Sequence, residues 1–290
     1  MLRSSLFFAW AAVSTLFFSA VAVAGGLLGA PKGLYDWVHR HWARGLLRVA
    51  GVQVRVSGLE NLRREVAQIL VCNHQSMFDI WVLMAALPVS LRFVAKQELS
   101  RIPVFARACR SAGHVFIERQ DRAGSIEAIR AAGARMREEG LSLVFFPEGT
   151  RSPDGRLRAF KRGTFVLAIE TQATLVPVAV DGGARILGRG DRRLRSGQLL
   201  VRCGAPIPLA GRTAEDRDEV LKESRASIER MLAELRTGGG LSGSRNPSTL
   251  EDEGGSDPTE DGAGGARGGE AARNVGDRGC AGTGDPRLSR

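Results

Sequence analysis

The segment Gln68-Ile-Leu-Val-Cys-Asn-His-Gln-Ser-Met-Phe-Asp79 joins an apolar run to a segment of helical spacing. Residues Gln68–Cys72 predict a buried β-strand, and Ser76–Leu87, which ends just before Pro88, predict a helix. A strand that passes directly into a helix is typical of open α/β sheets, whose functional sites lie beyond the carboxyl ends of the strands. The turn between strand and helix is therefore the first place where we expect a site.

Outside this segment, short strand-like runs alternate with segments of helical spacing. The further predicted strands are Val52–Ser57, Leu91–Ala95, His114–Ile117, Leu141–Phe146, Leu175–Val180 and Leu199–Cys203. The further predicted helices are Ala123–Glu139, Thr164–Gln172 and Ala214–Arg236. Strands separated by helices predict an α/β sheet with helices on both of its faces.

The N-terminus carries a long uncharged segment. Residues Ser4–Ala30 are mostly Phe, Leu, Val and Ala, and a helix of this length can span a hydrocarbon layer of roughly 30 Å. Basic residues follow it, and because such residues tend to stay cytoplasmic, the rest of the chain is expected to be cytoplasmic. They are Lys32, Arg40, Arg44 and Arg48. The alternative is a cleaved signal peptide, which Arg3 and the small residues Ala22–Ala24 resemble, but the length of the run favours a membrane anchor.

Composition divides the chain into three predicted parts. Residues 1–50 form the membrane anchor with a basic interfacial segment, and residues 51–236 form the globular domain. From Thr237 to Arg290, Gly, Ser, Pro and charged residues dominate, and large apolar residues are almost absent. Because such a segment cannot bury enough apolar surface to offset its loss of conformational entropy, we predict a disordered, Gly-rich tail over residues 237–290.

The chain is strongly basic, with a formal net charge of +10. A basic protein can bind nucleic acid, an anionic membrane or an acidic substrate. Proteins that grip single-stranded nucleic acid interleave aromatic with basic residues, whereas several aromatics here lie in the N-terminal apolar run. The balance favours a lipid surface and phosphate. The four cysteines are widely scattered and predict no disulfide framework.

Two segments that follow predicted strands carry residues suited to chemistry. His74 and Asp79 flank the first turn, where a carboxylate can hold one imidazole nitrogen and leave the other as a base. Alone, this spacing is weak evidence and more often marks a structural histidine than a catalytic one. In Phe145–Ser152, Gly149 permits close backbone approach, and Arg151 offers a planar fork of donors to a phosphate monoester.

Four blocks, in this order, resemble those of the glycerolipid acyltransferases, specifically the bacterial 1-acyl-sn-glycerol-3-phosphate acyltransferases. The blocks are Asn73–Asp79 (NHQSMFD, family pattern NHxSxxD), Gly113–Arg119 (GHVFIER, pattern GxxFIxR), Phe146–Ser152 (FPEGTRS) and Val176–Val180 (VPVAV). The resemblance covers Val52 to Pro208, and Glu118 stands where the family often has Asp. It implies a central mixed sheet flanked by helices, of the glycerol-3-phosphate acyltransferase type, with residues 51–236 as the acyltransferase domain.

The resemblance also implies an activity: transfer of a fatty acyl group from acyl-CoA or acyl carrier protein to the free hydroxyl of 1-acyl-sn-glycerol-3-phosphate (lysophosphatidic acid). The product would be phosphatidic acid, for phospholipid synthesis. His74 would be the general base and Asp79 its orienting partner, with no acyl-enzyme, cofactor or metal. The residues expected to bind the acceptor are Arg119, Glu148, Gly149, Thr150, Arg151 and Lys161. The expected location is the cell inner membrane, with the catalytic domain on the cytoplasmic face.

Other interpretations stay open at this point. The acceptor could be glycerol-3-phosphate or a lyso-ornithine lipid, because the blocks address only the hydroxyl and phosphate ends. The chain could also be a membrane-anchored protein that binds anionic lipid without turnover, although a pure binder needs no oriented base such as His74. A nucleic-acid binder would need a separate basic stripe, for which Arg185–Arg195 is the candidate. The acyl donor and the chain-length preference are not determined by the sequence.

Overall fold

The computed structural model describes residues 2–118 and 121–238, and the described residues form one seven-stranded sheet. The strands are β1 (Val52–Ser57), β2 (Gln68–Cys72), β3 (Leu91–Lys96), β4 (Val115–Ile117), β5 (Ser142–Phe145), β6 (Thr174–Asp181) and β7 (Gly197–Cys203). Their order across the sheet is β1-β7-β6-β2-β5-β3-β4. All neighbours run parallel except β6 and β7, so the sheet is mixed, and β1 and β7 run against the other strands.

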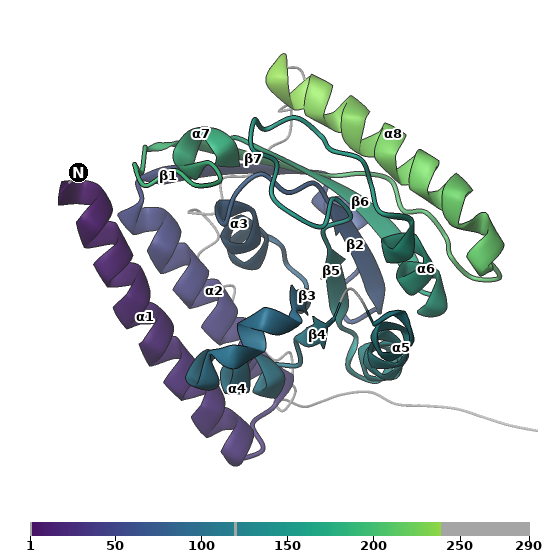
Figure 1. Ribbon diagram of the computed structural model, residues 1–290, viewed down its shortest axis with the longest axis horizontal. Coiled ribbons are helices and arrows are strands. Elements are labelled where there is room, and N and C mark those ends of the chain that lie inside the picture. The colour runs from purple at the N-terminus through teal and green to yellow at the C-terminus, as the bar shows by residue number, and fades with distance from the viewer. Residues whose placement is uncertain (1, 119–120, 239–290) are drawn as a thin grey trace, which may run out of the picture. The chain divides into compact units, whose positions relative to one another are not determined.

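Helices cover both faces of this sheet (Figure 1). The α-helices are α1 (Leu2–Leu27), α2 (Lys32–Val49), α3 (Phe78–Ala86), α4 (Pro103–Ser111), α5 (Arg122–Glu139), α6 (Arg162–Glu170), α7 (Gly183–Leu187) and α8 (Arg217–Arg236). Short 3-10 helices are η1 (Leu59–Asn61), η2 (Gln97–Arg101) and η3 (Ala214–Asp216). One apolar cluster, with Leu46 and Phe78, joins the sheet to α2 and α3, and a second, with Ile129, Phe165 and Ile228, joins it to α5, α6 and α8.

The predicted α/β alternation is confirmed, and β1 and β2 have their predicted bounds. β2 is buried at every residue because β5 and β6 flank it and apolar clusters cover both of its faces. Neither α4 nor the helix α2 was among the predicted elements. Both helices place arginines between their apolar residues; α4 packs against α1, and α2 packs against both α1 and α3.

α1 is the predicted membrane anchor, and it is the one helix among the described residues that is long and apolar enough to cross a membrane. Near its start, Phe7 is 1 % exposed and packs against Phe78 and Trp81, with ring centroids 5.9 and 6.0 Å away. Near its end, Ala22 packs against Ala108 of α4. Both ends of α1 therefore contact the same domain, while its opposite side exposes large apolar side chains.

The Arg-rich segment 185–195 folds into α7 and a return towards β7 that contacts the start of α1. The backbone N–H of Leu194 donates to Ser4 Oγ at 3.0 Å, and the Arg3 guanidinium donates to the carbonyl of Ala50 at 2.6 Å. These bonds tie the N-terminal helix to the domain. The predicted domain boundaries at residues 50 and 236 stay a prediction, and residues 239–290 of the predicted tail lie outside the described residues.

Candidate active site

The turn between β2 and α3 brings His74 and Asp79 into contact. His74 Nδ1 lies 2.9 Å from Asp79 Oδ2. The same oxygen accepts the backbone N–H groups of Gln75 at 2.5 Å and Ser76 at 2.7 Å. Asp79 also lies in the first turn of α3, where the helix dipole favours a negative charge. Three donors and a helix N-terminus thus hold a fully buried carboxylate behind one imidazole.

Asp79 determines which nitrogen of His74 carries the proton. An ionised carboxylate only accepts hydrogen bonds, so Nδ1 carries the proton and Nε2 presents its lone pair. The imidazole stacks on Phe146, with ring centroids 4.0 Å apart, which restricts its rotation. The His74 side chain is 13 % exposed, and no described residue hydrogen-bonds its Nε2. The arrangement therefore leaves Nε2 as an oriented base.

Gly183, at the start of α7, lies against the other oxygen of the Asp79 carboxylate. This oxygen, Oδ1, is buried and has no hydrogen-bond partner among the described residues. A Cβ atom on Gly183 would lie 2.5 Å from Oδ1 and 2.9 Å from Ser76 Cβ, so only glycine lets α7 come this close. Sequence reasoning gave Gly183 no role, and the signal that could have found it is the Gly182-Gly183 pair, which one residue, Asp181, separates from the fourth block.

Two further side chains of the first block fasten the turn to the rest of the fold. Asn73 makes a pair of hydrogen bonds with the backbone of Val180 on β6, each 2.8 Å long. Ser76 Oγ donates to the carbonyl of Leu187 at the end of α7, at 2.6 Å. Sequence reasoning missed both roles. The first block therefore supplies the candidate His74–Asp79 pair and also the groups that fix its position.

The loop after β5 is hydrogen-bonded to the backbone of His74 on both sides. The N–H of His74 donates to Glu148 Oε1 at 2.7 Å, and the N–H of Ser152 donates to the carbonyl of His74 at 2.8 Å. The second oxygen of Glu148 accepts the N–H of Arg158 at 3.1 Å. Burial raises the pKa of Glu148, and the N–H donors of His74 and Arg158 oppose part of this rise. The fold thus brings the first and third sequence blocks together.

The other predicted acceptor-binding residues surround this loop. Gly149 has a φ of +72°, and a Cβ on it would lie 2.7 Å from Lys161 Cε, so the Lys161 side chain passes directly over the glycine. Thr150 and Arg151 follow and are partly exposed. Arg119 lies outside the described residues, and its place in the site stays a prediction.

The described side chains near the turn do not suit metal or thiol chemistry. Within residues 2–118 and 121–238, no group of three or more His, Cys, Asp or Glu could hold a metal ion. Cys72 precedes the turn, and burial raises the pKa of its thiol well above the ordinary value. A thiol that stays protonated is a poor nucleophile, so His74 remains the reactive group that the geometry favours.

Comparison with known proteins finds acyltransferases. The model of the family described as "Acyltransferase" matches residues 53–181. The chain is 31% identical to the human 1-acyl-sn-glycerol-3-phosphate acyltransferase alpha over 189 residues, which cover 65% of this chain and 67% of that protein. It is also 31% identical to the 1-acyl-sn-glycerol-3-phosphate acyltransferase of Limnanthes douglasii, covering 66% of this chain and 63% of that one. The chain therefore spans about two thirds of the length of these relatives.

A solved structure resembles the fold over nearly its whole length. The crystal structure of the 1-acyl-sn-glycerophosphate (LPA) acyltransferase PlsC from Thermotoga maritima aligns with a TM-score of 0.69 and 25% sequence identity. The alignment covers 81% of this chain and 95% of that one. The mixed, helix-flanked sheet and the resemblance drawn from the four blocks are both confirmed. The chain belongs to the acyltransferase family that includes the 1-acyl-sn-glycerol-3-phosphate acyltransferases.

Proposed function

We propose that this protein transfers a fatty acyl group from a thioester donor to the free hydroxyl of 1-acyl-sn-glycerol-3-phosphate, which gives phosphatidic acid. The observation that carries the proposal is the contact between His74 and Asp79, which leaves Nε2 free beside the Glu148–Ser152 loop. Family membership supplies the reaction class, and the oriented imidazole supplies the group that this reaction needs.

The chemistry requires one base and no covalent intermediate. His74 Nε2 takes the proton of the acceptor hydroxyl while the hydroxyl oxygen attacks the thioester carbonyl. The tetrahedral intermediate then expels the thiolate as the carbon–sulfur bond breaks, and the imidazolium returns its proton to that sulfur. Asp79 stabilises the imidazolium between these two steps. Each proton and electron pair is accounted for by His74 and the two substrates.

The acceptor phosphate is assigned to the loop that follows β5. Arg151 offers a planar fork of donors that matches a phosphate, and Lys161 brings a second cation over Gly149. Because Ser152 is bonded to the backbone of His74, the phosphate end and the base keep a constant separation. This constancy favours one hydroxyl of the bound acceptor over others, since rate depends steeply on the position of the reacting atoms.

Glu148 is assigned to positioning instead of substrate contact. It is 3 % exposed, and its two oxygens hold the backbone N–H groups of His74 and Arg158. In Glu148→Gln, the amide NH2 must face one of these N–H donors, which leaves that donor unpaired. We expect kcat to fall about tenfold or more while KM for the acceptor changes less than about threefold. Steady-state kinetics at varied acceptor concentration tests this. A rise in KM at constant kcat would indicate that Glu148 binds the substrate instead.

Membrane association is assigned to the exposed side of α1. This side presents Leu6, Val13, Leu16 and Phe17, each more than half exposed. Because both ends of α1 contact the domain, we propose that the helix lies along the membrane surface with this side inserted. The domain would then sit at the cytoplasmic face of the cell inner membrane, where both acyl-CoA and acyl carrier protein can reach it.

The proposal is tested with the full chain in membranes. Labelled acyl-CoA or acyl carrier protein is offered together with 1-acylglycerol-3-phosphate, glycerol-3-phosphate or a lyso-ornithine lipid. We expect phosphatidic acid from the first acceptor and a loss of about 10²- to 10⁴-fold in His74→Ala. Preferred turnover of another acceptor would keep the mechanism and change the substrate. No turnover with any pair, from folded protein in the membrane fraction, would overturn the proposal.

A further inference from the structure

Large apolar side chains are exposed in this protein almost entirely on one part of its surface. Within the described residues, all of them except Val66 and Met77 lie on α1, the residue after it, α2 or the η2–α4 segment. α5, α6 and α8, which cover the opposite face of the sheet, expose none. An exposed apolar surface confined to one region marks an interaction site.

The η2–α4 segment contributes its own part of this surface. Leu99 is 41 % exposed, Ile102 is 52 % and Val104 is 44 %. The segment is anchored from behind, because Ala106 and Ala108 of α4 are buried and Ala108 packs against α1. The three exposed side chains therefore stand at the amino end of a fixed helix.

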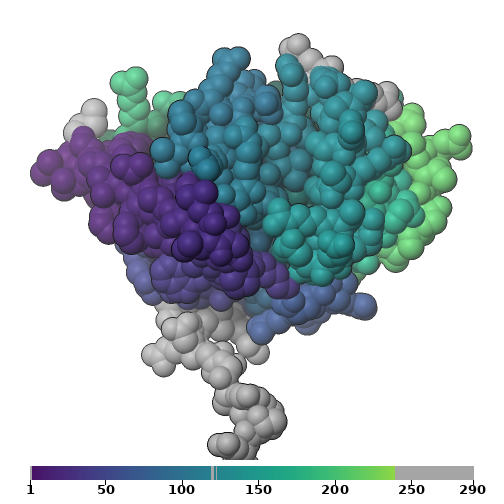
Figure 2. Space-filling model, turned by 90° about the horizontal axis from the view of Figure 1, so that it is seen from below, coloured from purple at the N-terminus to yellow at the C-terminus, as the bar shows by residue number. Residues whose placement is uncertain are grey.

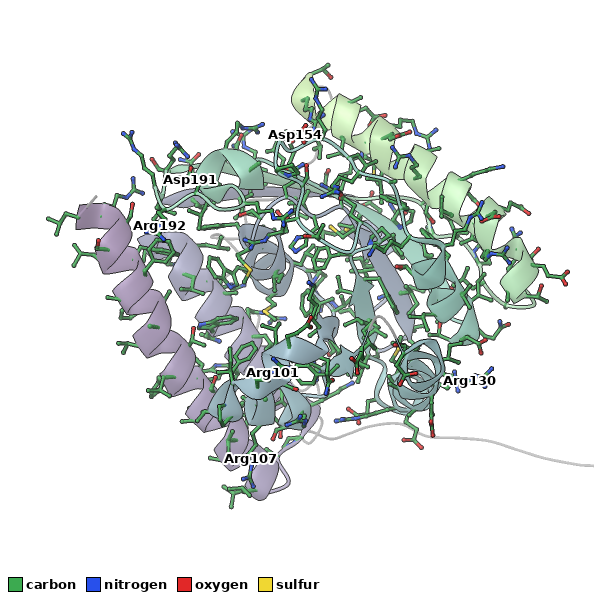
Figure 3. The ribbon with its side chains drawn as sticks, in the orientation of Figure 1. Arg101, Arg107, Arg130, Asp154, Asp191 and Arg192 are labelled. Atoms are coloured by element: carbon green, nitrogen blue, oxygen red, sulfur yellow. The ribbon has the colours of Figure 1, made fainter. Side chains whose placement is uncertain are left out.

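Unpaired cations accompany these apolar side chains. Arg101 and Arg107 are exposed, and neither forms an ion pair with another described residue. Figure 3 shows Arg107 near the lower end of α1 and Arg101 on the neighbouring η2–α4 segment, whereas Arg130 lies across the molecule on α5. Apolar side chains next to exposed arginines are the composition that binds an anionic lipid surface, where arginines meet headgroups and apolar groups enter the acyl layer.

The segment is continuous with α1 and lies near the candidate active site. α1 and α4 pack together, and Figure 2 shows the purple α1 bordering the blue-teal surface near residue 100 on one face. η2 follows β3 directly, and β3 is parallel to β5, which is parallel to β2. η2 therefore starts at the edge of the sheet that carries His74 and Asp79.

We propose that η2 and α4 form a second membrane-contacting surface, beside α1, that holds the active-site edge against anionic lipid so that the acceptor reaches His74 from the bilayer. This inference rests on the proposed function for the identity of the acceptor only. A second copy of this chain is a poorer occupant, because two such surfaces would bring Arg101 and Arg107 of both copies together. A bilayer of anionic lipid matches the charge and extends the apolar side of α1.

The test separates membrane delivery from chemistry by using two acceptors. The full chain is assayed with 1-oleoylglycerol-3-phosphate in vesicles of phosphatidylcholine and phosphatidylglycerol in equal amounts, and with dissolved 1-butanoylglycerol-3-phosphate. The variants are Leu99→Ser/Ile102→Ser/Val104→Ser and Arg101→Glu/Arg107→Glu. We expect a fall of about tenfold or more in kcat/KM with the vesicle acceptor, together with weaker flotation with vesicles. Activity with the dissolved acceptor should stay within about twofold of wild type.

A matched control changes the same amount of charge elsewhere. Lys222→Glu/Arg230→Glu alters two exposed cations of α8, on the opposite face of the sheet, and should leave both activities within about twofold. Equal losses with both acceptors, or variants that match the control, would overturn the inference. A dimer in the wild type that the variants dissolve would also overturn it in favour of a second copy. Vesicle binding that the variants lose, in a wild type inactive on both acceptors, would reject the proposed function and keep this surface.

Discussion

Two histidine-containing pairs lie on the same side of the sheet, and their partners give them opposite properties. At the carboxyl edge, His74 contacts the buried carboxylate of Asp79. Between α2 and the turn before β4, His114 Nε2 lies 3.1 Å from Nε2 of His39. The first histidine has an acceptor-only partner, whereas the second pair consists of two imidazoles.

Burial keeps both imidazoles of the second pair neutral, and their hydrogen bonds fit this state. His114 Nδ1 accepts the backbone N–H of Phe93 at 3.0 Å, so its proton lies on Nε2 and is donated to His39. Burial and then the nearby Arg92 lower the pKa of His39 to about 3. Burial, His39 and Arg92 lower the pKa of His114 well below its ordinary value.

The comparison indicates that the charged group beside each imidazole decides whether the histidine is suited to act as a base. Asp79 fixes the tautomer of His74 and can stabilise a positive charge on the ring. Arg92, which is 1 % exposed and pairs with Asp36 at 2.7 Å, opposes any positive charge on His39 or His114. The first pair is therefore suited to move protons, and the second to fill space without charge.

The largest effect is expected when the carboxylate of Asp79 is replaced by an amide. In Asp79→Asn, the amide cannot stabilise an imidazolium and offers one acceptor where the carboxylate offered two. We expect kcat to fall by about 10²- to 10⁴-fold and the acidic limb of the pH–rate profile, which reports the ionisation of a general base, to change. Kinetics with the dissolved short-chain acceptor measure this without a membrane step, and an unfolding curve checks the fold. Activity within about threefold of wild type would show that Asp79 does not orient His74 for the reaction.

A smaller effect should follow when the Asp79 carboxylate is displaced but kept. In Gly183→Ala, the new Cβ would start 2.5 Å from Asp79 Oδ1, so the carboxylate or α7 must move. A displacement of this kind is expected to lower kcat by about ten- to a hundredfold. Gly45→Ala is the matched control, because a Cβ there meets nothing within 4 Å. Equal activity in the two variants would show that α7 can yield without disturbing the reacting pair.

The second pair should affect stability and leave chemistry unchanged. The folded-state pKa of His39, about 3, lies below its unfolded value of 6.5, so the unfolded state takes up a proton first as pH falls. The associated stability is complete above the unfolded pKa and is lost between about pH 6.5 and pH 3. In His39→Leu, the slope of unfolding free energy against pH over this window should fall by up to about 1.4 kcal/mol per pH unit.

The same variant also has an expected cost at neutral pH and an activity control. His39→Leu leaves the Nε2–H of His114 without its acceptor, which should lower stability by about 1 to 3 kcal/mol at pH 7.5. Its kcat with the dissolved acceptor should stay within about twofold of wild type. Denaturant unfolding at several pH values measures the slope. An unchanged slope would mean that His39 already carries a proton in the folded protein, contrary to the hydrogen-bond pattern.

Local sequence predicted the elements whose burial leaves a clear pattern of apolar residues in the chain. The run Gln68–Cys72 reads as a buried strand because both of its faces are covered, and the turn that follows keeps His74 and Asp79 close in sequence. The family blocks then predicted which loops would meet at the site. α4 was not predicted; its apolar residues pack against α1, more than seventy residues away in the chain.

The parts of the site that sequence reasoning missed depend on contacts between distant segments. Gly183 acquires its role only when α7 folds back on Asp79, and Asn73 only when β6 lies beside β2. The pairing of His39 with His114 joins residues 75 positions apart. None of these contacts leaves a periodic pattern in the chain, so composition and spacing could not indicate them.

The backbone of His74 is bonded on both sides, by Glu148 and by Ser152, as though it were still inside the sheet. Asn73 extends this pattern to β6 through its side chain. Local opening of the loop after β5 would therefore break the two hydrogen bonds that hold the backbone of His74 beside the central strands. The amide of His74 should therefore exchange with solvent about as slowly as those of the central strands, so the proposed base would already be in place when substrates arrive.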